Sequence, residues 1–289
     1  MNNTSLEGGA KENKENGKNV TIVVKMLRHG ERDKETRLTD YGRQVTREKA
    51  QRLGYSPEAF DAVKPVGSNV GPKGLTRFGR ALETAEIYAG EIAGDEAFNT
   101  RLQEVLNYTT FKTKAPYNHV EIYNSHLHAD FDSLTDIEKS KAAKKAQTAT
   151  LSHLLSLNSP EAEAYRREVA GAYAYVVDHY MRMAHRLHSG SRVLIPAGGH
   201  GGHMELLLQQ ALVRKEGDHE ISGFSDLSEI GGDIDPSEAF NVTIATDEEG
   251  KMGPLMVKFD ELTRPQIGMH LDPVRIKELR DYYVSLHEE

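Results

Sequence analysis

Short apolar runs and longer amphipathic segments alternate along the chain. Asn19–Leu27 and Arg192–Ala197 are short runs rich in β-branched and other apolar residues, which is typical of strands buried on both faces. Residues 77–93 and 161–188 instead repeat apolar side chains every three to four positions, which predicts helices with one apolar face. Strands that alternate with helices in this way predict an α/β protein with a largely parallel sheet.

Capping and turn residues add further elements. Thr39 or Asp40 is a typical N-cap, so a helix is predicted to begin there and to end before Gly54. Asn241–Thr246 and Leu255–Phe259 flank a polar turn, a pattern that indicates an antiparallel hairpin. The same reasoning predicts one helix after Gly202 and another over residues 273–286.

These elements predict one domain over residues 19–289, folded as a three-layer α/β/α sandwich around a mostly parallel central sheet. Residues 1–18 contain almost no apolar side chains and are expected to form a flexible tail. Residues 105–158 are expected to form a helical cap insertion over the functional site. Substrate choice would reside in such an insertion.

The composition excludes several classes of chemistry. The 289 residues include no cysteine, which excludes disulfides, cysteine-ligated zinc, iron–sulfur clusters and a catalytic thiol. A formal net charge of −8 argues against a general nucleic-acid partner. No apolar run reaches the roughly 20 residues that span a bilayer, and the first residues lack the pattern of a signal peptide. We therefore expect a cytoplasmic protein with no membrane partner.

Two of the predicted strands end in histidine. Arg28-His29-Gly30 follows the first strand, and His200 lies in a glycine-rich turn after the strand that begins at Arg192. Ligands of parallel sheets bind at the carboxyl ends of strands, so both histidines are expected to meet there. Arginine offers a fork of donors suited to phosphate, and Arg80 near the start of a predicted helix adds a second one. The pattern predicts a phosphate-binding site with a nucleophile inside it.

Five motifs in order resemble those of the histidine phosphatase superfamily, in its phosphoglycerate mutase-like branch. They cover about residues 20–260. They are Leu27-Arg28-His29-Gly30-Glu31, Leu38-Thr39-Asp40-Tyr41-Gly42, Thr76-Arg77-Phe78-Gly79-Arg80-Ala81-Leu82-Glu83-Thr84-Ala85, Arg101-Leu102-Gln103-Glu104 and Val193-Leu194-Ile195-Pro196-Ala197-Gly198-Gly199-His200-Gly201-Gly202.

The resemblance implies a metal-independent phosphatase that needs no cofactor. His29 would be the nucleophile and form a phosphohistidine, and Glu104 would protonate the leaving oxygen. His200, with both arginines, would hold the phosphoryl oxygens. The phosphate-binding set implied in this way is Arg28, Arg80, Gly30 and Gly201. The substrate would be a phosphorylated small molecule or a phosphoprotein.

Some positions depart from the family pattern. Thr76-Arg77 replaces a serine-proline pair, and Gly199 replaces the serine that usually precedes the second histidine. Gly201 stands where the acid-phosphatase branch carries an aspartate, which favours Glu104 as the acid, with Glu31 as its rival. The segment 31–37 is short compared with the mutases, which favours a phosphatase over a mutase.

Three alternatives remain from the sequence. One is a phosphoglycerate mutase-type phosphotransferase, and another is a non-catalytic module that binds a phosphorylated ligand. The third is a metal hydrolase built on His126, His128 and Asp130, which resemble part of a metal-binding motif but lack its final histidine. Neither the particular substrate nor the oligomeric state follows from the sequence.

Overall fold

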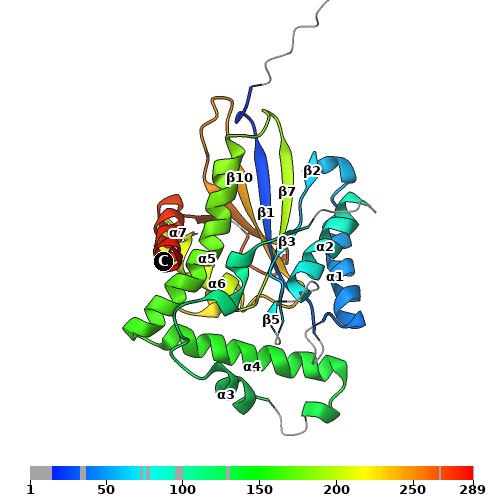
Figure 1. The fold of residues 1–289 in the computed structure, drawn as a ribbon, viewed down its shortest axis with the longest axis vertical. Coiled ribbons are helices and arrows are strands. Elements are labelled where there is room, and N and C mark those ends of the chain that lie inside the picture. Colours follow the sequence, from blue (N-terminus) through cyan, green and yellow to red (C-terminus); the bar gives the residue numbers. More distant parts are fainter. Residues whose placement is uncertain are drawn as a thin grey trace, which may run out of the picture.

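The computed structural model describes residues 15–32, 37–71, 74–75, 79–94, 100–127, 131–266 and 268–288. The fold is a mixed α/β architecture in which helices flank a central sheet (Figure 1). Within the described residues, ten strands form this sheet in the order β6-β3-β7-β1-β10-β11-β12-β8-β9, with β2 beside β7. A separate pair is formed by β4 (Val70–Gly71) and β5 (Gly74–Leu75).

The strands of the main sheet are β1 (Thr21–Arg28), β2 (Ala62–Val63), β3 (Val66–Gly67), β6 (Arg101–Leu102), β7 (Arg192–Gly199), β8 (Leu212–Glu216), β9 (His219–Ser222), β10 (Ala239–Ala245), β11 (Leu255–Phe259) and β12 (His270–Leu271). The α-helices of the described residues are α1 (Asp40–Arg52), α2 (Arg80–Ala93), α3 (His119–Ser125), α4 (Asp136–Ser156), α5 (Pro160–Ala184), α6 (His203–Ala211) and α7 (Pro273–His287). Short 3₁₀ helices cover Pro57–Ala59, Glu104–Leu106, Tyr108–Thr110, Phe131–Ser133 and Leu227–Ile230.

The expectation of a mostly parallel sheet is only partly met. The half that contains β1, β7, β3, β2 and β6 is parallel, as predicted. From β1 outward through β10, β11, β12, β8 and β9, every pairing is antiparallel. In this half, residues 217–218 join β8 to β9 and residues 246–254 join β10 to β11. Connections this short join antiparallel neighbours, since a parallel crossover needs a dozen or more residues.

Two apolar cores show that helices cover both faces of the sheet. Ile22, Val24 and Met26 of β1 belong to the larger core, which also contains residues of α5, α6 and α7. Leu27, which points to the opposite face, belongs to a smaller core with residues of α1 and α2. Alternation of this kind follows from the two-residue period of a strand. The predicted layers α/β/α are therefore present.

Several predicted boundaries match the structure closely. The side chain of Thr39 accepts a hydrogen bond from the backbone N–H of Gly42, so Thr39 is the N-cap of α1. The predicted hairpin is formed by β10 and β11. The helix predicted over 161–188 ends at Ala184 because the chain then turns to pair with residues near the amino terminus.

Ordered structure begins earlier than the sequence predicts. Residues 1–14 of the predicted tail lie outside the described residues. Asn16 forms an antiparallel bridge with His188, and the N–H of Gly17 donates to the carbonyl of Leu187 at 2.8 Å. The last residues of the predicted tail therefore pair with the loop after α5.

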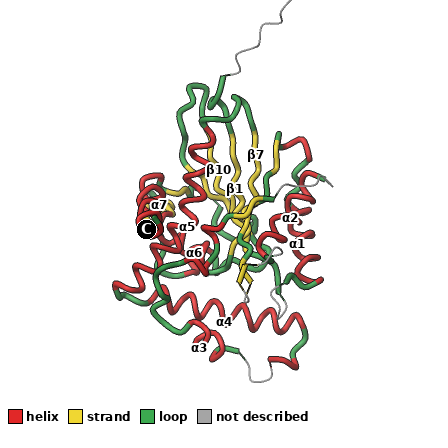
Figure 2. The backbone as a smooth tube through the Cα atoms, in the orientation of Figure 1, coloured by secondary structure: helices red, strands yellow, loops and turns green. Residues whose placement is uncertain are grey.

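The segment predicted as a cap contains α3 and α4, which lie beyond the carboxyl ends of β1 and β7 (Figures 1 and 2). A capping box formed by Thr135 and Glu138 begins α4. Its carboxyl-terminal half buries Leu151 and Leu154 in the larger core. These contacts fix α4 against the domain.

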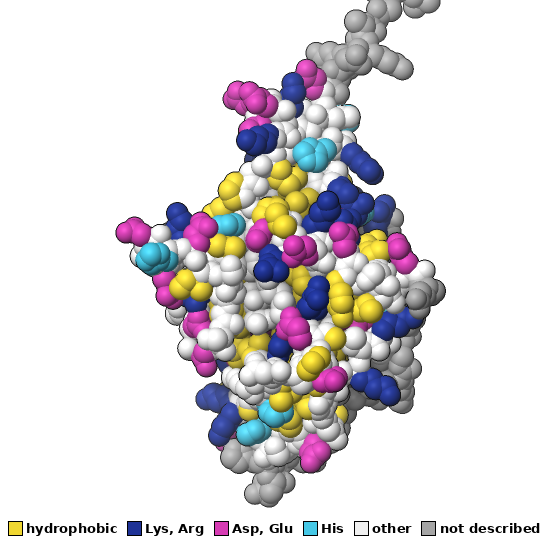
Figure 3. All heavy atoms as spheres, turned by 90° about the vertical axis from the view of Figure 1, so that its left-hand side faces the viewer, with side chains coloured by type: hydrophobic (Ala, Val, Ile, Leu, Met, Phe, Trp, Pro, Cys, Tyr) yellow, Lys and Arg dark blue, Asp and Glu magenta, His cyan; other side chains and the backbone are white. Residues whose placement is uncertain are grey.

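The surface beside α5 and α7 carries interspersed charges of both signs (Figure 3). Asp178 of α5 pairs with Arg182 at 3.0 Å and with Arg280 of α7 at 3.2 Å. No helix in the part of the chain that the structure describes is both long and apolar enough to cross a lipid bilayer.

Candidate functional site

The parallel pairing of β1 with β7 brings the two strand-end histidines together. Arg28 lies opposite Gly199 in the register of these strands. The backbone N–H of His29 donates to the carbonyl of Gly199 at 3.1 Å. The ring centroids of His29 and His200 are 5.4 Å apart, with the rings nearly perpendicular. The predicted convergence at the carboxyl edge of the sheet is confirmed.

The turn after His29 requires glycine. A Cβ atom at Gly30 would lie within 3 Å of the hydroxyl oxygens of Ser237 and Thr46. The backbone N–H of Gly30 donates a hydrogen bond to Oγ1 of Thr84 in α2 at 3.0 Å. The turn is thereby held between α1, α2 and the loop before β10, which fixes the direction of the His29 ring.

One hydrogen bond fixes the tautomer of His29. Its Nδ1 lies 2.8 Å from the carbonyl oxygen of Gly30. A carbonyl oxygen can only accept, so Nδ1 carries the proton in the neutral ring. The lone pair is then on Nε2. His29 is half-buried, so a ligand at the strand ends can reach this nitrogen.

A chain of polar groups fixes the tautomer of His200. Oδ1 of Asn107 accepts from the backbone N–H of Asn69 at 3.3 Å and from the hydroxyl of Ser68 at 2.8 Å. Because that hydroxyl donates to Asn107, it accepts from Nε2–H of His200 at 3.0 Å. Nδ1 of His200 is buried and has no hydrogen-bond partner in the part of the chain that the structure describes. A ligand at this position would complete the hydrogen bonding of the ring.

Tyr173 of α5 occupies the space that the glycine at position 199 leaves open. Its hydroxyl accepts from the backbone N–H of His200 at 3.0 Å. A Cβ at Gly199 would overlap this hydroxyl. The absence of the usual serine therefore does not leave the His200 turn without a hydrogen-bond partner. Sequence reasoning did not find Tyr173, Ser68 or Asn107, because their contacts join segments far apart in the chain.

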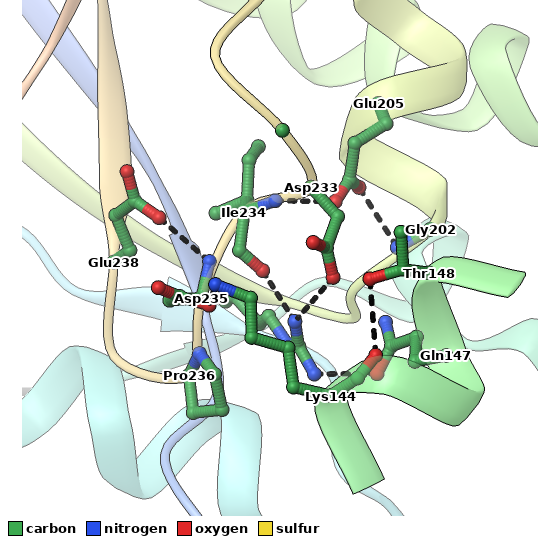
Figure 4. Close-up of polar contacts among 12 residues, drawn as sticks. Lys144, Gln147, Thr148, Gly202, Glu205, Asp233, Ile234, Asp235, Pro236 and Glu238 are labelled. Carbon is green, nitrogen blue, oxygen red and sulfur yellow. Dashed lines mark hydrogen bonds and ion pairs between the residues drawn. The ribbon is translucent and has the colours of Figure 1, made fainter. Parts of the chain in front are cut away.

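Arg28 is buried, and most of its guanidinium is held by protein groups. Nη1 donates to the carbonyl of Ile234, and Nη2 donates to the side-chain oxygen of Gln147 in α4. Nη1 also lies 3.7 Å from a carboxylate oxygen of Asp233. In Figure 4, Gln147, Asp233 and Ile234 converge from α4 and from the loop before β10. Nε of Arg28 is buried, and no described residue forms a hydrogen bond with it.

Arg80 is a buried cation at the start of α2. Within the described residues, its Nε and Nη1 have no hydrogen-bond partner. Burial, together with the nearby charges of Arg32 and Arg28, lowers the pKa of Arg80 to about 10. Buried charges in proteins are normally paired with an opposite charge, so the binding of an anion beside Arg80 is favoured.

The site as a whole disfavours any further positive charge. Burial lowers the pKa of His29 well below its usual value, and the charges of Arg80, His200 and Arg28 add to this effect. Burial and Arg80 also lower the pKa of His200. Both rings are therefore neutral near pH 7 in the ligand-free protein, which leaves Nε2 of His29 nucleophilic.

These pKa shifts predict a loss of stability in acid. Below about pH 6.5, His29 and His200 bind protons in the unfolded protein but stay neutral in the folded protein. The free energy of unfolding therefore falls as the pH falls. The limiting slope is about 1.4 kcal/mol per pH unit for each histidine. Urea unfolding at pH 7.5 and pH 5.0 should show a larger loss in the wild type than in a variant carrying His29→Ala and His200→Ala. Equal losses would contradict the assigned pKa directions.

Glu104 begins a 3₁₀ helix that directly precedes Asn107, which is linked to His200 by hydrogen bonds through Ser68. Asn107, which binds Ser68, follows in the same segment, and the ring of Tyr108 packs on His200 at 5.2 Å between centroids. The Glu104 side chain is exposed, whereas the rival Glu31 is half-buried in the segment after His29. The predicted acid therefore lies on a segment that packs on His200.

Other predicted residues fall partly outside the described chain. Residues 76–78 of the third motif and the pair His128 and Asp130 are among those not described. His126 is exposed at the end of α3. In the described segments, no three or more histidine, aspartate or glutamate side chains are grouped as metal ligands would be.

Comparisons with known proteins find similarity only at the level of structure. No protein-family model matches the chain, and no curated protein matches it. A mycobacterial glucosyl-3-phosphoglycerate phosphatase is similar at 13% identity and a TM-score of 0.39, over 83% of this chain and 97% of that one. Its complex with inorganic phosphate gives 15% identity and the same TM-score over 83% and 95% of the two chains.

A phosphoserine phosphatase from Entamoeba histolytica, in complex with 3-phosphoglyceric acid, gives 18% identity and a TM-score of 0.29. That similarity covers 64% of this chain and 77% of that chain.

Proposed function

We propose that this chain is a metal-independent phosphatase of the histidine phosphatase superfamily, which hydrolyses a phosphomonoester through a phosphohistidine on His29. The observation that carries this proposal is a neutral His29 with its proton on Nδ1, close enough to Arg80 for that charge to lower its pKa, while Nε and Nη1 of Arg80 have no hydrogen-bond partner among the described residues. A tetrahedral phosphoryl group supplies both the electrophile for His29 and the anion that Arg80 lacks.

The first step forms the phosphoenzyme. The lone pair on Nε2 of His29 attacks phosphorus, and the bond from phosphorus to the ester oxygen breaks. That oxygen leaves with the bonding electrons and takes a proton from Glu104. Arg28 and Arg80 stabilise the negative charge spread over the phosphoryl oxygens in the transition state, which is the charge a metal ion would otherwise balance.

The second step returns the free enzyme. Glu104, now a carboxylate, takes a proton from water as the water oxygen attacks phosphorus. The phosphorus–nitrogen bond breaks, its electrons return to Nε2, and orthophosphate is released. The hydrogen bond from Nδ1 to Gly30 holds the ring in one tautomer through both steps.

Hydrolysis of para-nitrophenyl phosphate in excess chelator tests the proposed reaction. We expect turnover that chelator does not reduce and that orthovanadate inhibits, since vanadate resembles the transition state. Activity that is lost in chelator and restored by a divalent metal would contradict the proposal.

Replacing Glu104 by glutamine tests the identity of the acid. An alkyl phosphate has a poor leaving group and needs protonation, whereas para-nitrophenolate leaves without it. We expect Glu104→Gln to reduce kcat on an alkyl phosphate by about 10²-fold or more, with a much smaller loss on para-nitrophenyl phosphate. Glu31→Gln is the matched control. Equal losses on both substrates in Glu104→Gln, or the selective loss in Glu31→Gln, would reject Glu104.

One observation favours a second candidate function, a non-catalytic module that binds a phosphorylated ligand. Among the described residues, the side chains with the largest effects on the pKa of His29 are Arg80, His200 and Arg28, none of them a carboxylate. A binding module needs the cations but no acid. It predicts tight binding of orthophosphate with no hydrolysis of any phosphomonoester, so the same assay separates the two functions.

A further inference from the structure

The predicted cap reaches the phosphate-binding centre through one side chain, Gln147 of α4. The helix is held above the strand ends by its buried leucines and by an ion pair at 2.6 Å between Lys144 and Asp235. One turn further along, Gln147 is half-buried and accepts a hydrogen bond from Arg28 (Figure 4). A residue of the inserted segment thus contacts a residue proposed to bind phosphate.

This contact fixes which way the Gln147 amide points. A guanidinium has only donors, so the atom that faces Arg28 is the amide oxygen. The amide nitrogen, Nε2, then lies on the other side of the group, next to the backbone of Gly201. A Cβ at Gly201 would lie within 3 Å of both Nε2 of Gln147 and Nε of Arg28. Nε2 of Gln147 and Nε of Arg28 therefore lie close together beside the backbone of Gly201.

Neither donor is used within the described protein. Nε of Arg28 is buried without a partner, and no hydrogen bond engages Nε2 of Gln147. Any side chain at position 201 would displace the Gln147 amide or Arg28, which explains the glycine there. Two neighbouring N–H donors of this kind are suited to bind an oxygen atom that accepts hydrogen bonds.

We propose that Gln147 is a substrate-binding residue, whose Nε2 donates a hydrogen bond to an oxygen of the phosphoryl group from the side of the cap. This inference rests on the proposed function only in naming a phosphomonoester as the ligand. Its consequence is that α4 contributes directly to affinity for the phosphoryl group, in addition to any contact it makes with the rest of the substrate.

Two substitutions at Gln147 separate donation to the ligand from positioning of Arg28. Gln147→Glu keeps an oxygen for Arg28 but removes the donor and places a negative charge beside the phosphoryl group. Gln147→Met removes both hydrogen bonds at similar volume. Thr148→Val is the matched control, because Thr148 is the next residue on α4 and its hydroxyl donates to the carbonyl of Lys144 at 3.0 Å.

The readouts are the dissociation constant of orthophosphate by calorimetry, and kcat and KM for para-nitrophenyl phosphate. We expect Gln147→Glu to raise the dissociation constant and KM by 30-fold or more, and Gln147→Met to raise them about tenfold. Neither variant should lower kcat more than threefold, and Thr148→Val should match the wild type.

Other results would overturn the inference. If Gln147→Glu binds orthophosphate as well as the wild type, the amide serves only to hold Arg28. If kcat falls while KM and the dissociation constant stay unchanged, Gln147 acts on the reaction without binding the phosphoryl group. Orthophosphate binding does not depend on turnover. A wild type that binds orthophosphate but hydrolyses nothing would therefore contradict the proposed function while still testing Gln147.

Discussion

Replacing Arg80 by methionine is expected to stabilise the ligand-free protein and to disable the site at the same time. The guanidinium is buried, and its Nε and Nη1 have no hydrogen-bond partner in the described part of the chain, so its removal relieves the cost of burying an incompletely paired charge. We expect the melting temperature to rise by about 2–4 °C, which corresponds to on the order of 1 kcal/mol. The value of kcat/KM should fall by about 10²–10³-fold, because one preorganised transition-state donor is lost.

Differential scanning calorimetry and steady-state kinetics test both halves of this prediction. Orthophosphate should raise the melting temperature of the wild type much more than that of Arg80→Met, since a ligand stabilises only the state that binds it. Arg182→Met is the matched control, because Arg182 lies on the surface of α5 and already pairs with Asp178. A melting temperature that falls in Arg80→Met, or activity that persists, would contradict the role assigned to this arginine.

Replacing His29 by alanine is expected to reduce kcat by about 10⁴-fold or more, because no other group in the proposed mechanism can accept the phosphoryl group. The fold should remain, since the side chain is half-buried and its hydrogen bond within the described residues is to the adjacent Gly30. Orthophosphate should still bind within about tenfold of wild-type affinity, because Arg28, Arg80 and His200 are unchanged.

His126→Ala, which alters an exposed histidine at the end of α3, should leave all these properties unchanged. Activity of His29→Ala near that of the wild type would exclude His29 as the nucleophile. Loss of orthophosphate binding along with activity would instead show that the substitution damages the whole site.

Local patterns explain which parts of the structure the sequence could predict. The strand ending at Arg28, the capped helix after Thr39 and the hairpin of β10 and β11 each depend on residues close together in the chain. The meeting of His29 and His200 was also predictable, because parallel strands in one sheet place their carboxyl ends at one edge.

The features of the fold and the site that the sequence does not predict depend on contacts between residues far apart in the chain. The antiparallel half of the sheet includes β12, a strand of two residues, and β9, whose side chains are largely exposed, so neither carries a distinct hydrophobic pattern. Tyr173 binds the His200 turn from 27 positions away, and Gln147 meets Arg28 across 119 positions. That Nε and Nη1 of Arg80 have no hydrogen-bond partner among the described residues is likewise a property of the folded site that composition does not reveal.

The most direct test of the proposed mechanism is detection of the phosphoenzyme. Wild-type protein would be mixed with para-nitrophenyl phosphate and stopped in alkali, because the phosphorus–nitrogen bond of phosphohistidine is labile in acid. Peptide mass spectrometry should then find one phosphoryl group on His29, phosphorus NMR should assign it to Nε2, and His29→Ala should carry none. Turnover without a phosphoryl group on His29, or with the group on another residue, would contradict the account.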